Sequence, residues 1–367
     1  MYKTKKVKIG NISIGGGLPV RVQSMTKTET ADWKATVNQI KKLEDAGCEI
    51  IRLAVPDMES ASALSKIKKN IKIPLVADIH FDWRLAVEAI KQGVDKIRIN
   101  PGNIGSRENI EKIISAAKKR KIPIRIGVNA GSLKILKKSG NWIKMSQQER
   151  AKQMVTELME NIQTFEDMNF TNIVVSLKAN DVSTTVLANK LFSKKRNYPI
   201  HLGITEAGTE FSGITKSAAA FGILLNQGIG DTIRVSLTAE PLEEVRAGWG
   251  ILKALDLRKR GVEIVSCPTC GRCETDLIKI VNRLERRLST VNYQPSTVPI
   301  KVAIMGCVVN GPGEAKDADI GIAGGKGFGL LFRKGNPVKK IPQEKWIDEI
   351  LRLLKKPNNP SAAADGD

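Results

Sequence analysis

The chain has 367 residues, of which 41% are hydrophobic, 26% are charged and 4% are aromatic, and its net charge is +21. This length and apolar content predict a globular protein with a large domain and a smaller one. No apolar run of about 18 residues occurs, and the Lys-rich start lacks the apolar core of a secretory signal, so we expect neither a membrane span nor secretion. Five cysteines, three of them bunched, argue against a disulfide framework and favour a reducing cytoplasm.

The high positive charge keeps a different class of function open. A basic nucleic-acid-binding protein with a structural metal or cluster is that alternative, because basic proteins often bind nucleic acid. However, the lysines are spread in short groups such as 68–69 and 118–119, and few aromatic side chains are available to stack on bases. We therefore favour a lysine-rich solvated surface and expect no nucleic-acid partner. An anionic substrate or an acidic protein partner is a further reason for such charge.

Eight short apolar runs recur through the first two thirds of the chain, separated mostly by segments with helical apolar spacing such as 35–46 and 83–93. Most intervals have the length of a strand–helix repeat, which predicts an N-terminal TIM (β/α)8 barrel rather than an open doubly wound sheet. The fifth interval is longer and carries an extra loop through 131–142. The predicted strands are Val20–Gln23, Glu49–Val55, Pro74–His80, Lys96–Asn100, Pro123–Asn129, Asn172–Lys178, Pro199–Thr205 and Thr232–Leu237.

Polar residues stand near the C-terminal end of nearly every predicted strand. In a TIM barrel these ends converge on the mouth that holds the active site. A single cation at a strand end is more often a surface ion-pair partner, but here cations recur in five repeats. Guanidinium groups match phosphate oxygens in pairs, so these cations predict a phosphate or diphosphate site. The candidate residues are Arg52, Asp78, His80, Arg98, Asn100, Arg125, Asn129, Lys178, Glu206, Arg234 and Ser236.

Three further residues are interpreted from their surroundings. His80 lies two residues after Asp78, on the same face of its strand, which favours a place in the site. His201 lies earlier in its predicted strand, and we interpret it as structural. Cys48 precedes a buried strand and is expected to be an inert core thiol.

The chain beyond the eighth strand predicts a second domain. The last barrel helix is expected at 241–255, so the barrel domain spans 1–255, and a basic linker follows at 256–261. A smaller α/β domain is expected at 262–356. The tail 357–367 is rich in Pro, Asn, Ala and Asp, and we expect it to be disordered.

Four of the five cysteines lie in this second domain. One predicted strand ends in Cys267-Pro-Thr-Cys270-Gly-Arg-Cys273, and another, 302–305, leads to Gly306-Cys307. Clustered thiolates select zinc or an iron–sulfur centre. Structural zinc usually takes paired ligands or histidine, whereas a lone distal cysteine resembles the three-plus-one pattern of cubane clusters. The spacing favours an iron–sulfur cluster and, taken alone, would make Cys273 a ligand.

Two long motifs make this part of the chain recognisable. Ser266-Cys-Pro-Thr-Cys-Gly-Arg272 and Gly306-Cys-Val-Val-Asn-Gly-Pro-Gly-Glu314 resemble the 4-hydroxy-3-methylbut-2-enyl diphosphate synthase family of the non-mevalonate isoprenoid pathway. The resemblance extends to Gly203-Ile-Thr-Glu-Ala-Gly208 and Val174-Val-Ser-Leu-Lys178, and so covers nearly the whole chain. It implies the two-domain bacterial form, a TIM barrel followed by an iron–sulfur domain.

The resemblance implies a ligand set that differs from the one suggested by spacing. In the family a [4Fe–4S] cluster is held by three cysteines and one glutamate, at positions matching Cys267, Cys270, Cys307 and Glu314. Cys273 would then be a spare thiol near the cluster. A carboxylate binds iron more weakly than a thiolate does, so Glu314 can give way to a substrate oxygen.

The resemblance also implies a reaction. Its substrate is 2-C-methyl-D-erythritol 2,4-cyclodiphosphate, whose ring is opened reductively with loss of water, and flavodoxin or ferredoxin supplies the electrons. The strand-end cations would bind the diphosphate, and Glu206 is the candidate proton donor. A head-to-tail homodimer is implied, in which the cluster domain of one subunit covers the barrel of the other. Another barrel-plus-cluster reductase of a phosphorylated metabolite is the alternative among enzymes.

Overall fold

The computed structural model describes residues 3–133, 144–290, 300–307 and 311–355. The chain forms two compact units, 1–258 and 259–367, and each has its own hydrophobic core. The division falls inside 256–261, the segment for which the sequence predicts a linker. The tail 357–367 and most of the extra loop 131–142 lie outside the described residues.

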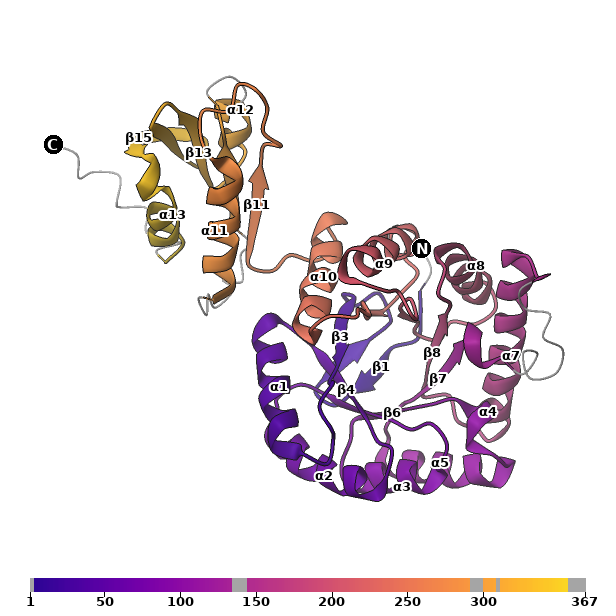
Figure 1. Ribbon diagram of the computed structural model, residues 1–367. Coiled ribbons are helices and arrows are strands. Elements are labelled where there is room, and N and C mark those ends of the chain that lie inside the picture. The colour runs from indigo at the N-terminus through magenta and orange to yellow at the C-terminus, as the bar shows by residue number, and fades with distance from the viewer. Residues whose placement is uncertain (1–2, 134–143, 291–299, 308–310, 356–367) are drawn as a thin grey trace. The chain divides into compact units, whose positions relative to one another are not determined.

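The first unit is a ring of eight parallel strands surrounded by helices (Figure 1). The strand order is β8-β7-β6-β5-β4-β3-β10-β9, and a parallel bridge between Val175 and Ile200 closes the ring from β8 to the start of β9. Each predicted run contains or overlaps one strand, so the TIM-barrel prediction is confirmed. The strands are β3 (Arg21–Met25), β4 (Ile50–Ala54), β5 (Leu75–Asp78), β6 (Lys96–Ile99), β7 (Ile124–Asn129), β8 (Ile173–Lys178), β9 (His201–Leu202) and β10 (Thr232–Ile233).

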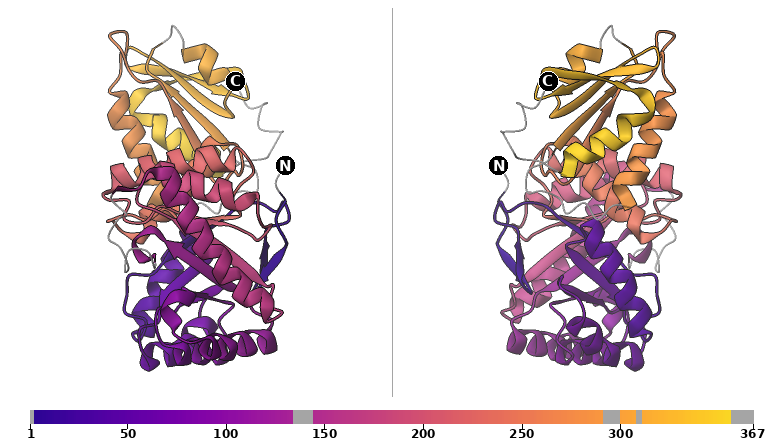
Figure 2. Two further views of the ribbon diagram at one scale, coloured as in Figure 1. Left: turned by 90° about the vertical axis from the view of Figure 1, so that its right-hand side faces the viewer. Right: turned by 90° about the vertical axis from the view of Figure 1, so that its left-hand side faces the viewer.

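An N-terminal β-hairpin, which the sequence analysis missed, closes one end of the ring (Figure 2). Strands β1 (Val7–Ile9) and β2 (Ile12–Ile14) pair antiparallel around Gly10. The hairpin packs against side chains near the beginnings of three barrel strands, at the end opposite the mouth. This apolar cluster, the barrel floor, consists of Val7, Ile9, Ile14, Ile50, Val76 and Val174.

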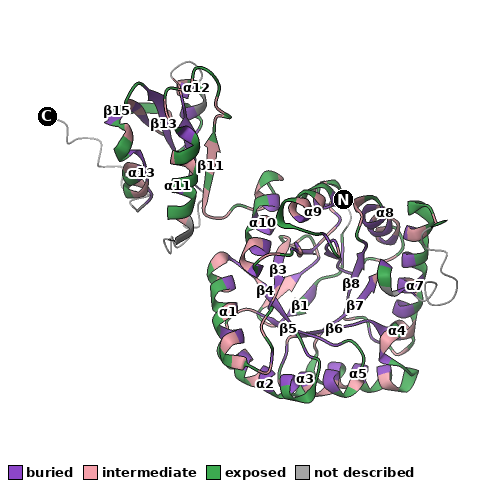
Figure 3. Cartoon of the chain, in the orientation of Figure 1, coloured by how far each residue is buried: buried purple, intermediate pink, exposed green. Residues whose placement is uncertain are grey.

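Most helices around the barrel begin at an Asp or Ser whose side chain accepts a backbone N–H of the first turn, as Asp32, Asp57 and Ser106 do. Their apolar faces pack on the strands, so the strands are almost wholly buried while the outer helix faces are exposed (Figure 3). No described helix is long and apolar enough to cross a bilayer. The helices are α1 (Trp33–Ala46), α2 (Met58–Lys69), α3 (Trp83–Lys91), α4 (Pro101–Ile104), α5 (Arg107–Arg120), α7 (Gln147–Asp167), α8 (Val182–Ser193), α9 (Glu210–Leu225) and α10 (Pro241–Ala254).

The second unit is a five-stranded mixed sheet with helices on both faces, which confirms the predicted smaller α/β domain. The first three strands run parallel and the last two antiparallel. Helices α11 (Leu277–Thr290) and α13 (Trp346–Lys355) cover one face, and α12 (Gly311–Lys316) covers the other. The strands are β11 (Val262–Ser266), β12 (Ile300–Met305), β13 (Ile320–Gly325), β14 (Phe328–Arg333) and β15 (Asn336–Pro342).

Candidate active site

Alternate residues of a barrel strand point inward, and the inward residues near the mouth of this barrel are cations. Arg52 of β4, Arg98 of β6, Arg125 of β7 and Lys178 of β8 are all buried, and Arg234 follows β10. Other arginines of this group lower the pKa of each of the buried residues Arg52, Arg125 and Lys178, so the five side chains lie close enough for their charges to interact. The structure therefore brings the five predicted cations together, and we call them the mouth cations.

Asp78 is the carboxylate within this group. Its Oδ1 accepts a hydrogen bond from Arg98 Nη1 at 3.1 Å, and its Oδ2 lies 3.7 Å from Arg52 Nε and 3.5 Å from His80 Nε2. Burial alone would raise the pKa of Asp78, but Arg52, His80, Arg98 and Arg125 outweigh it and hold that pKa well below its usual range. Asp78 is therefore ionised and fixes the orientation of two arginines.

A second carboxylate, Glu244 of α10, orients Arg234. Arg234 Nη2 lies 3.2 Å from Glu244 Oε1, and the buried Glu244 also accepts from Leu237 N at 3.1 Å and from Ser24 Oγ at 3.3 Å. Sequence reasoning missed this role, because a glutamate in the first turn of a helix is ordinarily explained by the helix dipole. Lys27, which the sequence analysis did not single out, contacts the carbonyl oxygens of Leu237 and Ala239.

The mouth cations outnumber these two carboxylates. Burial, the largest cause, lowers the pKa of Arg52 to about 10 and lowers the pKa values of Arg125 and Lys178 well below their usual ranges. Neighbouring arginines lower all three further, which shows that like charges are held together without full compensation. A polyanion is the ligand that would relieve this repulsion.

Two glycines leave room for the mouth cations. A Cβ atom on Gly127 would lie 3.2 Å from Arg98 Nε, and one on Gly203 would lie 2.5 Å from Lys178 Nζ. Glycine in a strand often marks such a close approach. The matched segment that starts at Gly203 therefore shapes the site through its backbone as well as through Glu206.

Gly203→Ala is expected to displace the end of the Lys178 side chain and to shift the Arg234 carbonyl oxygen, 3.2 Å from the added Cβ, by a few tenths of an ångström, without unfolding the barrel. We expect the affinity for a diphosphate to fall roughly tenfold, as for one weakened charged hydrogen bond. Gly222→Ala is the matched control, since nothing lies within 4 Å of its added Cβ. Calorimetric affinities and melting temperatures of both variants test this, and an unchanged affinity in Gly203→Ala would contradict it.

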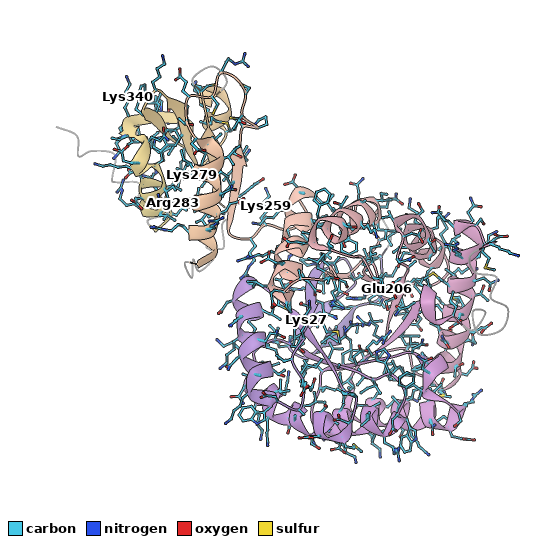
Figure 4. All side chains as sticks on the ribbon, in the orientation of Figure 1. Lys27, Glu206, Lys259, Lys279, Arg283 and Lys340 are labelled. Atoms are coloured by element: carbon cyan, nitrogen blue, oxygen red, sulfur yellow. The ribbon has the colours of Figure 1, made fainter. Side chains whose placement is uncertain are left out.

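The remaining predicted residues lie around the same mouth. Asn129 ends β7 at the position paired with Lys178, and Ser236 lies two residues beyond Arg234. The His80 side chain is half exposed. Glu206 is exposed, with a left-handed φ of 51°, and Figure 4 shows it with Lys27 over the inside of the ring of strands. An exposed acid at a mouth is placed to meet solvent and ligand alike.

The cysteine loops lie at the C-terminal ends of two neighbouring strands of the second unit. Strands β11 and β12 are parallel, with Ser266 paired to Ile304, so the residues that follow them are adjacent. Gly306 N–H donates to Cys267 Sγ at 3.4 Å, and a Cβ on Gly306 would lie 3.5 Å from that sulfur and 2.3 Å from Cys273 Sγ. Two thiols therefore lie over the Gly306 backbone, and Cys307 is the next residue.

This donor set fits an iron–sulfur centre, because the loops supply thiolate ligands and a glycine backbone that can approach sulfur. Cys270 is exposed, and Glu314 lies in α12. The side chain of Glu314 is outside the described residues. Within the described part of the chain, no group of three or more Cys, His, Asp or Glu side chains is arranged so that it could hold a metal ion.

Cys48 is a different kind of thiol. It is 3% exposed in the barrel core, where burial raises its pKa to about 12. Its place in the core agrees with the prediction, and a buried thiol of raised pKa is expected to be inert.

A TIM barrel with a cation-lined mouth, followed by a small domain with thiolate ligands, defines the class of iron–sulfur barrel enzymes. The chain matches the GcpE TIM-barrel domain over residues 4–249 and the GcpE protein C-terminal domain over residues 263–356. It belongs to the GcpE family.

Curated relatives are similar over their full length. A protein of Clostridium acetobutylicum is 54% identical over 354 residues, covering 96% of this chain and 98% of the relative. One of Caldanaerobacter subterraneus is 55% identical over 355 residues, covering 96% and 97%. Both are named 4-hydroxy-3-methylbut-2-en-1-yl diphosphate synthase (flavodoxin). Among solved structures, dihydropteroate synthase of Stenotrophomonas maltophilia is 14% identical with a TM-score of 0.52, covers 69% of this chain and 97% of its own, and shares the fold alone.

Proposed function

We propose that the protein converts 2-C-methyl-D-erythritol 2,4-cyclodiphosphate to 4-hydroxy-3-methylbut-2-enyl diphosphate in isoprenoid biosynthesis. The reaction opens the cyclic diphosphate, consumes two electrons and two protons, and releases one water. The observation that carries the proposal is the excess of buried positive charge at the barrel mouth. The family and the names of its curated relatives support the particular substrate.

The mouth cations, Arg52, Arg98, Arg125, Lys178 and Arg234, are proposed to bind the diphosphate. Asp78 and Glu244 hold three of these arginines in place, so little reorganisation is needed when the substrate arrives. His80, Asn129 and Ser236 are proposed to orient the rest of the substrate. Glu206 is the proposed proton donor for the hydroxyl that leaves as water, because it is an exposed acid on the matched segment at the mouth.

Cys267, Cys270, Cys307 and Glu314 are proposed to hold a [4Fe–4S] cluster. When bound, such a cluster supplies electrons one at a time at a single iron position. The three thiolates would keep the cluster on the second unit, and Glu314 would be its more weakly bound ligand. The Gly306 N–H that reaches Cys267 Sγ offers a hydrogen bond that tunes the sulfur ligand.

Flavodoxin is the proposed electron donor, since relatives at 53–55% identity carry it in their names, and ferredoxin is the alternative. We propose a cytoplasmic location, where thiols stay reduced, and no nucleic-acid partner. The working unit is proposed to be a head-to-tail homodimer in which one subunit's cluster domain covers the other's barrel.

The proposal is tested by anaerobic turnover of the cyclodiphosphate with an artificial reductant. Arg98→Ala and Arg234→Ala are expected to keep the visible spectrum of the cluster and to lower kcat/KM by roughly 10- to 100-fold, because each loses a charged hydrogen bond worth about 1.5–3 kcal/mol. Arg84→Ala, which removes an exposed arginine of α3, is the matched control. Unchanged kinetics in both mouth variants would remove the mouth from the substrate site.

A further inference from the structure

Below the mouth cations the barrel holds polar side chains whose hydrogen bonds are missing. Lys96 of β6 and His201 of β9 are fully buried, and Arg125 and Gln23 are nearly so. In the described structure, Lys96 Nζ, Arg125 Nε and Nη1, His201 Nε2 and both amide atoms of Gln23 have no hydrogen-bond partner. His201 Nδ1, by contrast, lies 2.8 Å from Thr232 Oγ1. Since buried polar groups are almost always bonded, these atoms call for an explanation.

Lys96 is the least expected member of the group. It lies two residues before Arg98, so it points to the same face of β6 but nearer the barrel floor. Its partner on β5 is Val76, which belongs to the apolar floor closed by the hairpin. A long amine that begins at an apolar floor can satisfy its nitrogen only by reaching toward the polar layer above.

The charged groups around Lys96 are cations. Arg125 from β7 and Arg52 from β4 act on it, and Lys96 in turn acts on His201 from β9. From β5 it meets Val76, and the hairpin contributes apolar side chains. Asp78, further along β5, is already paired with Arg52 and Arg98. Lys96 therefore has no carboxylate of its own among the described residues.

An uncharged Lys96 would account both for the unpaired Nζ atom and for the cations that surround it. Burial, and then Arg125 and Arg52, hold the pKa of Lys96 well below its usual range. A neutral amine also has a lone pair and can accept a hydrogen bond from a donor such as Arg125, which an ammonium cannot do.

We propose that Lys96 is a further positioning residue of the diphosphate site, uncharged in the free protein and protonated when a diphosphate binds above it. This inference rests on the proposed function. A diphosphate brings negative charge to Arg52 and Arg125, the two cations that oppose a charge on Lys96. Once protonated, Lys96 adds a positive charge beneath the bound phosphates and strengthens their hold on the site.

The sign of the pH dependence follows from this scheme. The complex holds one more proton than the free protein wherever the pH lies between the pKa of Lys96 in the free protein and its higher pKa in the complex. In that window the affinity falls about tenfold for each unit by which the pH rises. Below the lower pKa and above the higher one, the affinity does not depend on Lys96. The phosphates of the cyclodiphosphate are fully ionised near neutral pH, so the ligand itself supplies no titrating proton.

Isothermal titration calorimetry counts the protons directly. The oxidised, cluster-containing protein is titrated anaerobically with the cyclodiphosphate, without a reductant, in buffers of different ionisation enthalpy at one pH. We expect uptake of about one proton per site in the wild-type protein and none in Lys96→Met. Lys96→Arg is expected to bind without proton uptake, because arginine stays charged. If Lys96→Met does not fold, the proton uptake of Lys96→Arg tests the role of Lys96 instead. Lys91→Met, which removes an exposed lysine of α3, should keep the uptake.

The outcomes separate this inference from the proposed function. Tight binding by the wild type without proton uptake would overturn the role of Lys96 and leave the function intact. Undiminished uptake in Lys96→Met would assign the proton to another group and would also overturn the inference. If the wild type does not bind the cyclodiphosphate at all, the proposed function fails and the inference fails with it.

Discussion

Glu314→Ala is expected to abolish most turnover, whereas Cys273→Ala is expected to keep both the cluster and the activity. Glu314 shares a continuous motif with Cys307 and lies in α12, the element that follows β12. Losing a cluster ligand should lower turnover by more than about 100-fold, since even outer-sphere partners of metal sites cost 10- to 100-fold. Iron content and anaerobic turnover, measured on the same reconstituted samples, test both variants.

The surroundings of Cys273 suit a packed thiol. Its Sγ donates to Thr275 O at 3.2 Å, and the side chain packs against the core of the second unit at the start of α11. Removing a small thiol from such a place costs little more than its buried surface. Its closeness to Gly306, beside Cys267, is nevertheless what a fourth ligand would also need, so only the paired measurement separates the two assignments.

Two control variants accompany the comparison of Glu314→Ala with Cys273→Ala. Cys307→Ser should lose the cluster, because it removes a ligand common to both assignments. Cys48→Ala should lose neither cluster nor activity, because Cys48 lies in the barrel core. Loss of the cluster in Cys273→Ala, together with full iron content and turnover in Glu314→Ala, would replace Glu314 by Cys273 in the ligand set.

The barrel could be predicted because its strands are buried on both faces. Such strands form short apolar runs, and their polar residues stand where the strands reach the mouth. The predicted lengths were less accurate at β9 and β10, which have two residues each, because the chain leaves the hydrogen-bonded ladder where it forms the mouth. The hairpin was missed because its strands of three residues are interrupted by lysine and serine.

The site could be predicted only in part. The mouth cations were found because five repeats carry a cation at a corresponding place, a pattern that can be recognised in the sequence alone. The role of Glu244 was invisible, since its contact with Arg234 joins a helix to a strand end. Lys96 did leave a signal, because it shares the inward face of β6 with Arg98. Its burial, and hence its chemistry, required the hairpin that closes the floor.

The proposed dimer is supported by where the chain leaves the first unit. Arg258, at the end of that unit, donates to Val20 O at 2.9 Å and pairs with Glu49 Oε2 at 2.5 Å. Val20 and Glu49 immediately precede β3 and β4, so this anchor lies at the end of the barrel opposite the mouth. The chain thus leaves the first unit at the floor end of the barrel, an exit that is compatible with the proposed dimer, in which two subunits cap each other under two-fold symmetry.

Mixing two inactive variants should therefore restore activity. Glu206→Gln damages the barrel mouth and Cys307→Ser damages the cluster domain, so a mixed dimer has one site in which both parts are intact. Random exchange makes about half of the dimers mixed, which predicts about a quarter of the wild-type turnover. Each variant exchanged with itself is the control and should stay inactive. If mass spectrometry verifies heterodimers and the mixture still shows no turnover, each site is built within a single chain and the shared-site dimer is wrong.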